Sequence, residues 1–188
     1  MTMIGIMRAA VVMAAMLPGM ALAHPGHGAD GLVHGLAHPL LGLDHVLAMV
    51  LVGVMAAQLS GRALWLVPAS FLLVMALGGV MGAAGVALPF VEAGIALSVI
   101  VLGAAVAFGL RAPLAVAMGL AGLFALFHGH AHGAEIPENA GGLAYAAGFL
   151  AATALLHGLG VLAGRLRPAA LRVAGGAAAL AGVVLLLG

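Results

Sequence analysis

One short stretch of this apolar chain combines histidines with a carboxylate: His38-Pro-Leu-Leu-Gly-Leu-Asp44-His45. His38 and His45 are seven residues apart, nearly two turns of an α-helix, so both would lie on one face. We expect Pro39 to occupy a first helical position, so that His38 caps the helix with its imidazole turned inward. An anionic carboxylate beside neutral imidazole nitrogens suits a divalent metal. The alternative is that Asp44 only hydrogen-bonds His45 and holds two helices together.

A second stretch, Phe127-His-Gly-His-Ala-His132-Gly-Ala-Glu135, carries three more histidines and an acid. His128 and His132 have the i, i+4 spacing that places two ligands of one metal on the same helix face. Glu135 lies three residues beyond His132 and continues that face, whereas His130 points elsewhere, toward the mouth of the site. The alternative is a solvated histidine-rich loop that gathers metal loosely.

Several single residues could also handle metal. Glu92 is open to three interpretations: a ligand, a counter-charge or an acid at the membrane interface. His157 is either an inner station that receives the ion before release or a histidine that hydrogen-bonds between helices. His24 and His27 form a metal collector or a flexible tail, and Met49 is either a soft ligand or packing material.

The composition places these residues in a membrane. The chain has 188 residues, of which 65% are hydrophobic and 6% are charged, and its mean hydropathy is +1.30. A soluble domain carries about 25% charged residues, so lipid must be the solvent here. The net charge of +1 argues against a nucleic-acid partner, and the absence of cysteine excludes disulfides and thiolate metal sites. Ionisable groups inside a span cost roughly 2.5–3.5 kcal/mol each, which indicates a function for them.

The hydropathy pattern predicts an all-α fold, a polytopic membrane helix bundle with about six transmembrane helices after a cleaved signal peptide. Residues 1–23 resemble a secretory signal that ends in the cleavage pattern Ala21-Leu22-Ala23, with an uncleaved first helix as the alternative. Residues 24–188 would form a single transmembrane domain. The expected spans are Leu32–Ala57, Leu64–Gly82, Val91–Gly109, Pro113–His132, Gly142–Ala163 and Ala169–Gly188.

The arginines predict how the chain is oriented. Five of them fall in alternate loops or just inside the following helix: Arg62, Arg111, Arg165, Arg167 and Arg172. By the positive-inside rule those ends are cytoplasmic. We therefore expect a multi-pass protein of the bacterial inner membrane with both ends of the mature chain in the periplasm. The two histidine clusters then fall in its periplasmic half.

Together the two stretches resemble the signature segments of the HupE/UreJ family, and the resemblance covers essentially the whole chain. Members of that family are regarded as nickel permeases encoded with nickel-hydrogenase or urease accessory genes. The first stretch is also similar to the HxxxxDH motif of nickel and cobalt transporters, with one extra residue between histidine and aspartate. The resemblance implies metal handling by His38, Asp44, His45, His132 and Glu135. It implies less about Glu92, which matches an acid of the third span, and about Phe71, which would line the path.

These expectations favour a secondary permease that takes up nickel, with cobalt as the other candidate, and that is not an enzyme. No P-loop is present, so ATP does not drive transport directly. The ion would be the transported substrate, and no permanent cofactor is expected. A membrane-embedded zinc metallohydrolase is the alternative, since histidine and aspartate could hold zinc that activates water. A haem-binding electron carrier with axial histidines is a third, although adjacent acids and scarce aromatics disfavour a haem pocket.

Overall fold

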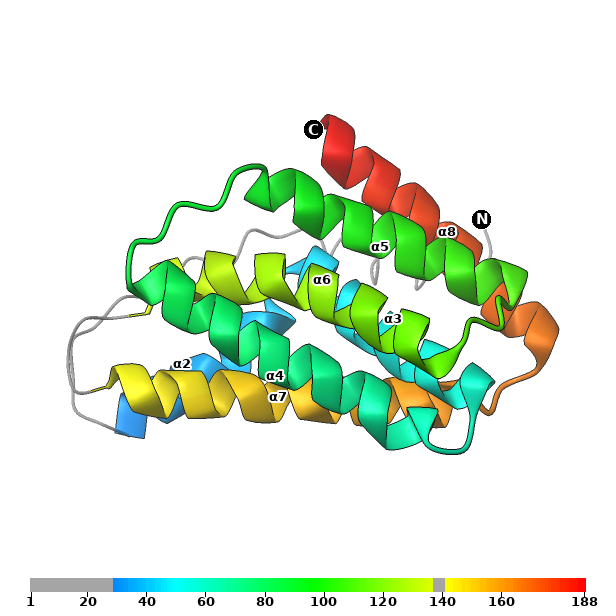
Figure 1. Cartoon of the computed structure of the whole chain (residues 1–188), viewed down its shortest axis with the longest axis horizontal. Coiled ribbons are helices and arrows are strands. Elements are labelled where there is room, and N and C mark those ends of the chain that lie inside the picture. The colour runs from blue at the N-terminus through cyan, green and yellow to red at the C-terminus, as the bar shows by residue number, and fades with distance from the viewer. Residues whose placement is uncertain (1–28, 137–140) are drawn as a thin grey trace, which may run out of the picture.

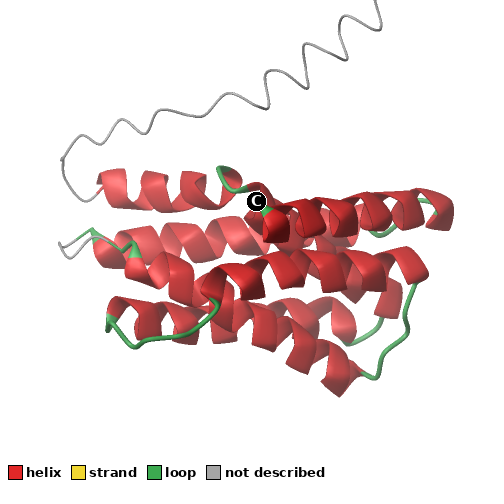
Figure 2. Cartoon of the chain, turned by 90° about the horizontal axis from the view of Figure 1, so that it is seen from above, coloured by secondary structure: helices red, strands yellow, loops and turns green. Residues whose placement is uncertain are grey.

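The computed structural model describes residues 29–136 and 141–188, so the predicted signal peptide, His24 and His27 lie outside the described residues. The described part is helical and contains no strand (Figures 1 and 2). This confirms the predicted all-α class. Its elements are α2 (Ala29–Ala37), the 3-10 turn η1 (His38–Leu40), α3 (Leu43–Leu59), α4 (Ala63–Ala83), α5 (Val91–Phe108), α6 (Leu114–Ala134), α7 (Gly142–Ala163) and α8 (Pro168–Leu187).

The helices from α4 to α8 are each long and apolar enough to cross a membrane. Their ends agree within two residues with the spans expected from hydropathy. Large apolar side chains cover the outside of the bundle, as on a protein whose solvent is lipid; Trp65 is 79% exposed and Leu143 is 87% exposed. These features confirm a polytopic membrane helix bundle.

The first expected span is a broken helix. The chain bends by 80° between α2–η1 and α3, so six spans result only if this bent pair counts as one. Pro39 has no N–H to continue the hydrogen-bond ladder, and a turn closes instead where Leu41 N–H donates to His38 O at 3.0 Å. Gly42 then takes extended backbone angles as the N-cap of α3. His38 therefore lies in η1 and is not the cap of α3.

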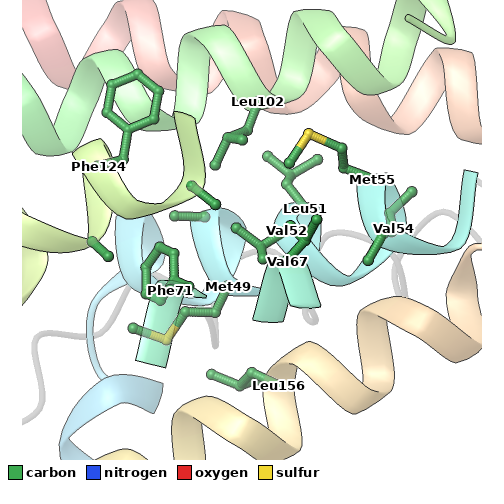
Figure 3. Packing of buried hydrophobic residues seen from close by; sticks show 14 of the residues in the cluster. Met49, Leu51, Val52, Val54, Met55, Val67, Phe71, Leu102, Phe124 and Leu156 are labelled. Atoms are coloured by element: carbon green, nitrogen blue, oxygen red, sulfur yellow. The ribbon is translucent and has the colours of Figure 1, made fainter. Parts of the chain in front are cut away.

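The helices pack in pairs that position the two histidine stretches. α4 lies along α6, α5 along α8, and α7 along both α2 and α3. The core between them consists of fully buried side chains such as Met49, Val52, Phe71 and Leu102 (Figure 3). Met49 thus has the position of a packing residue. α3 contacts α4, α5 and α7, and His45 in its first turn is buried inside the bundle.

Two glycines allow the close contacts that fix the site. A Cβ on Gly129 would lie 2.0 Å from the carbonyl oxygen of Met75, so α6 can approach α4 only without a side chain there. A Cβ on Gly35 would likewise lie 2.0 Å from the carbonyl oxygen of Tyr145. Gly35 lets α2 lie on the first half of α7 and brings the following turn, η1, over the end of α6.

The arginine-bearing connections lie together at one end of the bundle. The α3–α4, α5–α6 and α7–α8 connections occupy the right-hand end in Figure 1, while η1 and the end of α6 lie toward the other. The two histidine stretches therefore lie away from the arginines, as the sequence predicts. That the arginine end is cytoplasmic remains a prediction.

Candidate metal centre

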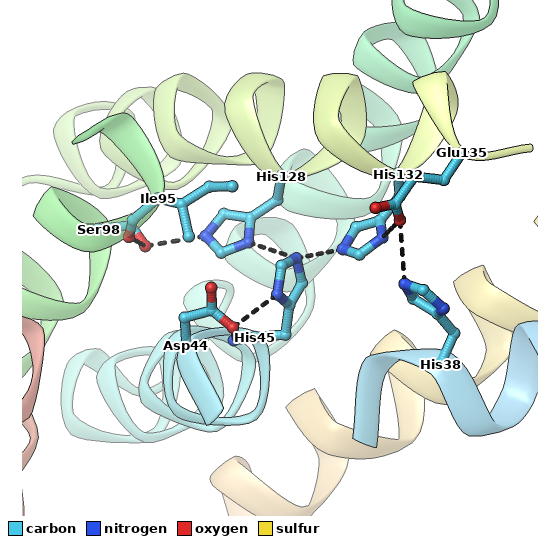
Figure 4. Close-up of polar contacts among 8 residues, drawn as sticks. All are labelled: His38, Asp44, His45, Ile95, Ser98, His128, His132 and Glu135. Atoms are coloured by element: carbon cyan, nitrogen blue, oxygen red, sulfur yellow. Dashed lines mark hydrogen bonds and ion pairs between the residues drawn. The ribbon is translucent and has the colours of Figure 1, made fainter. Parts of the chain in front are cut away.

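Three segments bring the predicted donors together: η1, the first turn of α3 and the last two turns of α6 (Figure 4). The bend after Pro39 separates His38 and His45 into different elements, yet both rings contact His132. The ring centroids of His38 and His132 are 4.8 Å apart, and those of His45 and His132 are 4.1 Å apart. His132 is thus the residue on which the two stretches meet.

The outer part of the centre contains His38, His132 and Glu135. Glu135 Oε2 lies 3.2 Å from His38 Nε2 and 3.3 Å from His132 Nδ1. One donor atom from each residue falls within 4.8 Å of the others. The Glu135 side chain is 57% exposed and that of His38 35% exposed, so an ion from outside can reach them. His132 Nδ1 is buried and makes no hydrogen bond to any described residue, which leaves it available to a cation.

Asp44 holds the ring of His45 in a defined orientation. Its Oδ1 accepts hydrogen bonds from the backbone N–H of His45 at 2.8 Å and from His45 Nδ1 at 2.9 Å. A carboxylate can only accept, so Nδ1 carries the proton of the neutral imidazole and Nε2 carries a lone pair. This carboxylate–histidine arrangement is the one that orients metal-binding imidazoles in proteins.

Ser98 fixes the ring of His128 in the same way. The Ser98 hydroxyl donates to the carbonyl oxygen of Ile95 at 2.6 Å, so its oxygen accepts from His128 Nε2 at 2.8 Å. The Nδ1 of neutral His128 is then left with a lone pair, and it lies 3.0 Å from His45 Nε2. His132 Nε2 also contacts His45 Nε2. With these tautomers the ring nitrogens face one another as acceptors, an arrangement that a bound cation or a shared proton would stabilise.

The distances fit one metal bound by neighbouring nitrogens. Ligands about 2.1 Å from an ion and 90° apart are about 3 Å from each other, close to the 3.0 Å between His128 Nδ1 and His45 Nε2. In the outer part, Glu135 Oε2 lies 3.2 Å from His38 Nε2 and 3.3 Å from His132 Nδ1, which is also close to this separation. Because Nδ1 of His132 faces Glu135 and its Nε2 faces His45, this one ring links an outer and an inner position for an ion.

Aromatic rings from α7 and α4 surround the imidazoles. Phe149 lies 4.3 Å from His132, Tyr145 lies 5.7 Å from His38, and Phe71 lies 5.9 Å from His128, measured between ring centroids. An apolar pocket of about 440 Å³ is lined by α4, α6 and α7 and reaches His132. The sequence reasoning missed Phe149, Tyr145 and Ser98. The i, i+4 spacing of the two aromatic residues could have indicated a shared face of α7.

The structure places Glu92 outside the row of histidines. Glu92 lines a separate pocket of about 340 Å³ together with Asp44 and with Leu185 and Leu186 of α8. Asp44 thus borders both this pocket and the group of histidines, since one of its oxygens accepts hydrogen bonds from His45. Two carboxylates beside one pocket give it a negative potential that attracts cations.

The other histidines in the described part of the chain lie outside this centre. His130 Nε2 donates to the carbonyl oxygen of Val86, 2.6 Å away in the α4–α5 connection, so it points away from His128 and His132 as expected. His34 is exposed on α2. His157 is buried in α7 and contacts Phe71, with their ring centroids 5.0 Å apart.

Comparison with known proteins finds relatives across nearly the whole chain. The sequence profile of the family described as HupE / UreJ protein matches residues 11–185. The chain is 53% identical over 177 residues to the protein described as Protein HupE of Rhizobium leguminosarum bv. viciae, a match that covers 92% of this chain and 93% of that protein. No solved structure matches the chain.

Proposed function

This chain belongs to the HupE/UreJ family, and we propose that it is a secondary permease that carries nickel, or alternatively cobalt, inward across the inner membrane. The imported ion would supply hydrogenase or urease maturation. The observation that carries this proposal is the convergence of three imidazoles inside the bundle, where His128 Nδ1 lies 3.0 Å from His45 Nε2 and His132 Nε2 contacts the same nitrogen. Imidazole and carboxylate donors without thiolate suit nickel and cobalt.

The proposed path begins at the exposed donors. An ion would exchange water for His38, Glu135 and His132 Nδ1, then move to the nitrogens of His45 and His128 while His132 Nε2 replaces Nδ1 as its ligand. Each step exchanges one or two ligands, so the ion never loses all its partners at once. Conduction requires binding that is favourable enough for entry and weak enough for release, and two adjacent positions provide this.

The membrane potential can drive the movement. One charge crossing 100 mV gains about 2.3 kcal/mol, so a divalent ion gains about 4.6 kcal/mol. This free energy can drive accumulation of the ion inside the cell without nucleotide hydrolysis. Proton coupling is compatible with the same donors, because a metal that leaves an imidazole can be replaced by a proton.

The test is uptake of radioactive nickel into proteoliposomes that contain the purified full-length chain, with an inside-negative potential set by potassium and valinomycin. We expect uptake to rise with the potential and to saturate with nickel. Cobalt should compete, and zinc and copper added separately measure selectivity. Empty liposomes are the control for leakage, and uptake equal to theirs would contradict the proposal. Tightly bound stoichiometric zinc without transport would instead favour a metallohydrolase.

A further inference from the structure

His157 is a buried histidine for which packing gives no explanation. Its side chain lies in α7, and the residue is only 2% exposed. Neither Nδ1 nor Nε2 has a hydrogen-bond partner among the described residues. The structure thus does not support a hydrogen bond between helices, one of the two roles expected for this histidine. Burying two unsatisfied ring nitrogens costs free energy, so a ligand for them would be stabilising.

His157 continues a line of side chains that starts at the metal centre. Phe149, Thr153 and His157 are spaced by four residues and therefore lie along one face of α7. Phe149, at the end of this row nearest the metal centre, contacts His132. At a rise of 1.5 Å per residue, His157 lies about 12 Å further along the helix than Phe149, toward the arginine end.

Phe71 separates His157 from the inner histidines. Its ring centroid is 5.0 Å from that of His157, at an interplanar angle of 86°, and 5.9 Å from that of His128. The Phe71 side chain is fully buried beside Met49 in the core (Figure 3). The Phe71 ring is therefore in contact with an imidazole on each side, His157 on one and His128 on the other.

Polar and soft atoms lie along this face of α7 between Phe149 and His157. The Thr153 hydroxyl donates to the carbonyl oxygen of Phe149 at 2.9 Å, which leaves its oxygen free to accept or to ligate. Met75 Sδ lies 4.0 Å from this oxygen, and Met75 also lines the pocket of about 440 Å³ that reaches His132. An ion that moves down this face would meet a hydroxyl and a thioether one helical turn before His157.

We propose that His157 is a further ligand for the transported ion, an inner station reached past Phe71 from the outer centre. This proposal rests on the proposed function, because it assigns a second stop on the same route. The ligand class is a divalent transition metal bound through an imidazole nitrogen. Phe71 would keep the two stations separate.

A spectroscopic test uses the absence of cysteine from the chain. In His157→Cys, excess nickel should produce a nickel–thiolate charge-transfer absorption, which no other residue of the protein can cause. Leu155→Cys is the matched control, because Leu155 lies in the same turn of α7 but is 66% exposed on the outer face. It should give no such band. A folded, monodisperse His157→Cys without the band would overturn the proposal.

A transport test separates this proposal from the proposed function. We expect nickel uptake by His157→Leu and His157→Gln to fall at least tenfold, while calorimetry shows one bound nickel fewer than in wild type and an unchanged outer site. Leu156→Ala is the control for packing, since Leu156 is a buried neighbour without a donor atom. Wild-type uptake in either folded His157 variant overturns the inner station alone. Absence of uptake by the wild-type protein overturns both proposals.

Discussion

Replacing Asp44 by asparagine tests whether this carboxylate acts by orienting His45. Asp44 Oδ1 accepts two hydrogen bonds from His45, at 2.8 Å from the backbone N and 2.9 Å from Nδ1. Asparagine has the same shape but no charge, and its amide can present either a donor or an acceptor to the ring. We expect Asp44→Asn to fold normally and to bind nickel 10- to 100-fold more weakly.

The magnitude follows from the contacts. A hydrogen bond to a charged group contributes about 1.5–3 kcal/mol, and each 1.4 kcal/mol changes an equilibrium constant tenfold. Losing the charge from the bond to the buried His45 ring therefore lowers affinity by about one to two powers of ten. Mutation of such outer partners of metal ligands costs 10–100-fold, which agrees. The fold should survive because the Asp44 side chain is 26% exposed and can be hydrated.

Titration calorimetry of nickel binding to the protein in lipid nanodiscs measures this effect. Ser70→Ala is the matched control, because the Ser70 hydroxyl donates to the carbonyl oxygen of Val67 at 2.8 Å and touches no residue of the centre. Its nickel affinity should equal that of the wild type. A folded Asp44→Asn protein with wild-type affinity would refute the orientation of His45 by Asp44. A loss far above 100-fold would indicate that Asp44 binds the ion directly.

Three further predictions concern the two positions for the ion and the packing around them. His132→Ala should abolish uptake at any nickel concentration because it removes a ligand from both positions, whereas uptake by His38→Ala should recover at high nickel; equal behaviour of the two variants in an uptake titration would contradict the linking role of His132. Nickel affinity should fall as the pH is lowered, because protons compete for the imidazole lone pairs, and calorimetry that shows no pH dependence would argue against imidazole ligands. Gly129→Ala should lower thermal stability and nickel affinity together, because its Cβ would lie 2.0 Å from the Met75 carbonyl oxygen; overpacking of this kind costs about 1–3 kcal/mol. Gly119→Ala in the same helix meets nothing within 4 Å and should leave both unchanged.

The sequence alone was sufficient to predict the helices from α4 to α8. Hydropathy is summed over neighbouring residues, and a span of about 20 apolar residues satisfies its own backbone by forming a helix. Such a prediction needs no knowledge of what packs against the helix. The donors could be identified by the same logic, because an ionisable side chain such as Asp44 is costly in an apolar segment and indicates a function.

The bend before α3 was not predicted, although its cause is visible in the sequence. Pro39 was expected to begin a helix, and in the structure η1 contains it while α3 begins only at Leu43. A proline is compatible with either outcome. In the structure α2 lies on α7 through the Gly35 contact and does not extend α3.

Which nitrogens remain free could be decided only by the tertiary structure. The sequence shows nine histidines with similar chemistry. Whether a ring nitrogen keeps its lone pair depends on the partner of the other nitrogen, and these partners are distant in sequence: Ser98 lies 30 residues before His128. His157 differs for the opposite reason, since the described residues around it supply a phenyl ring and no hydrogen-bond partner for its nitrogens. The residue types were thus set by the sequence, while helix packing decided both the burial of each imidazole and the direction of its lone pair.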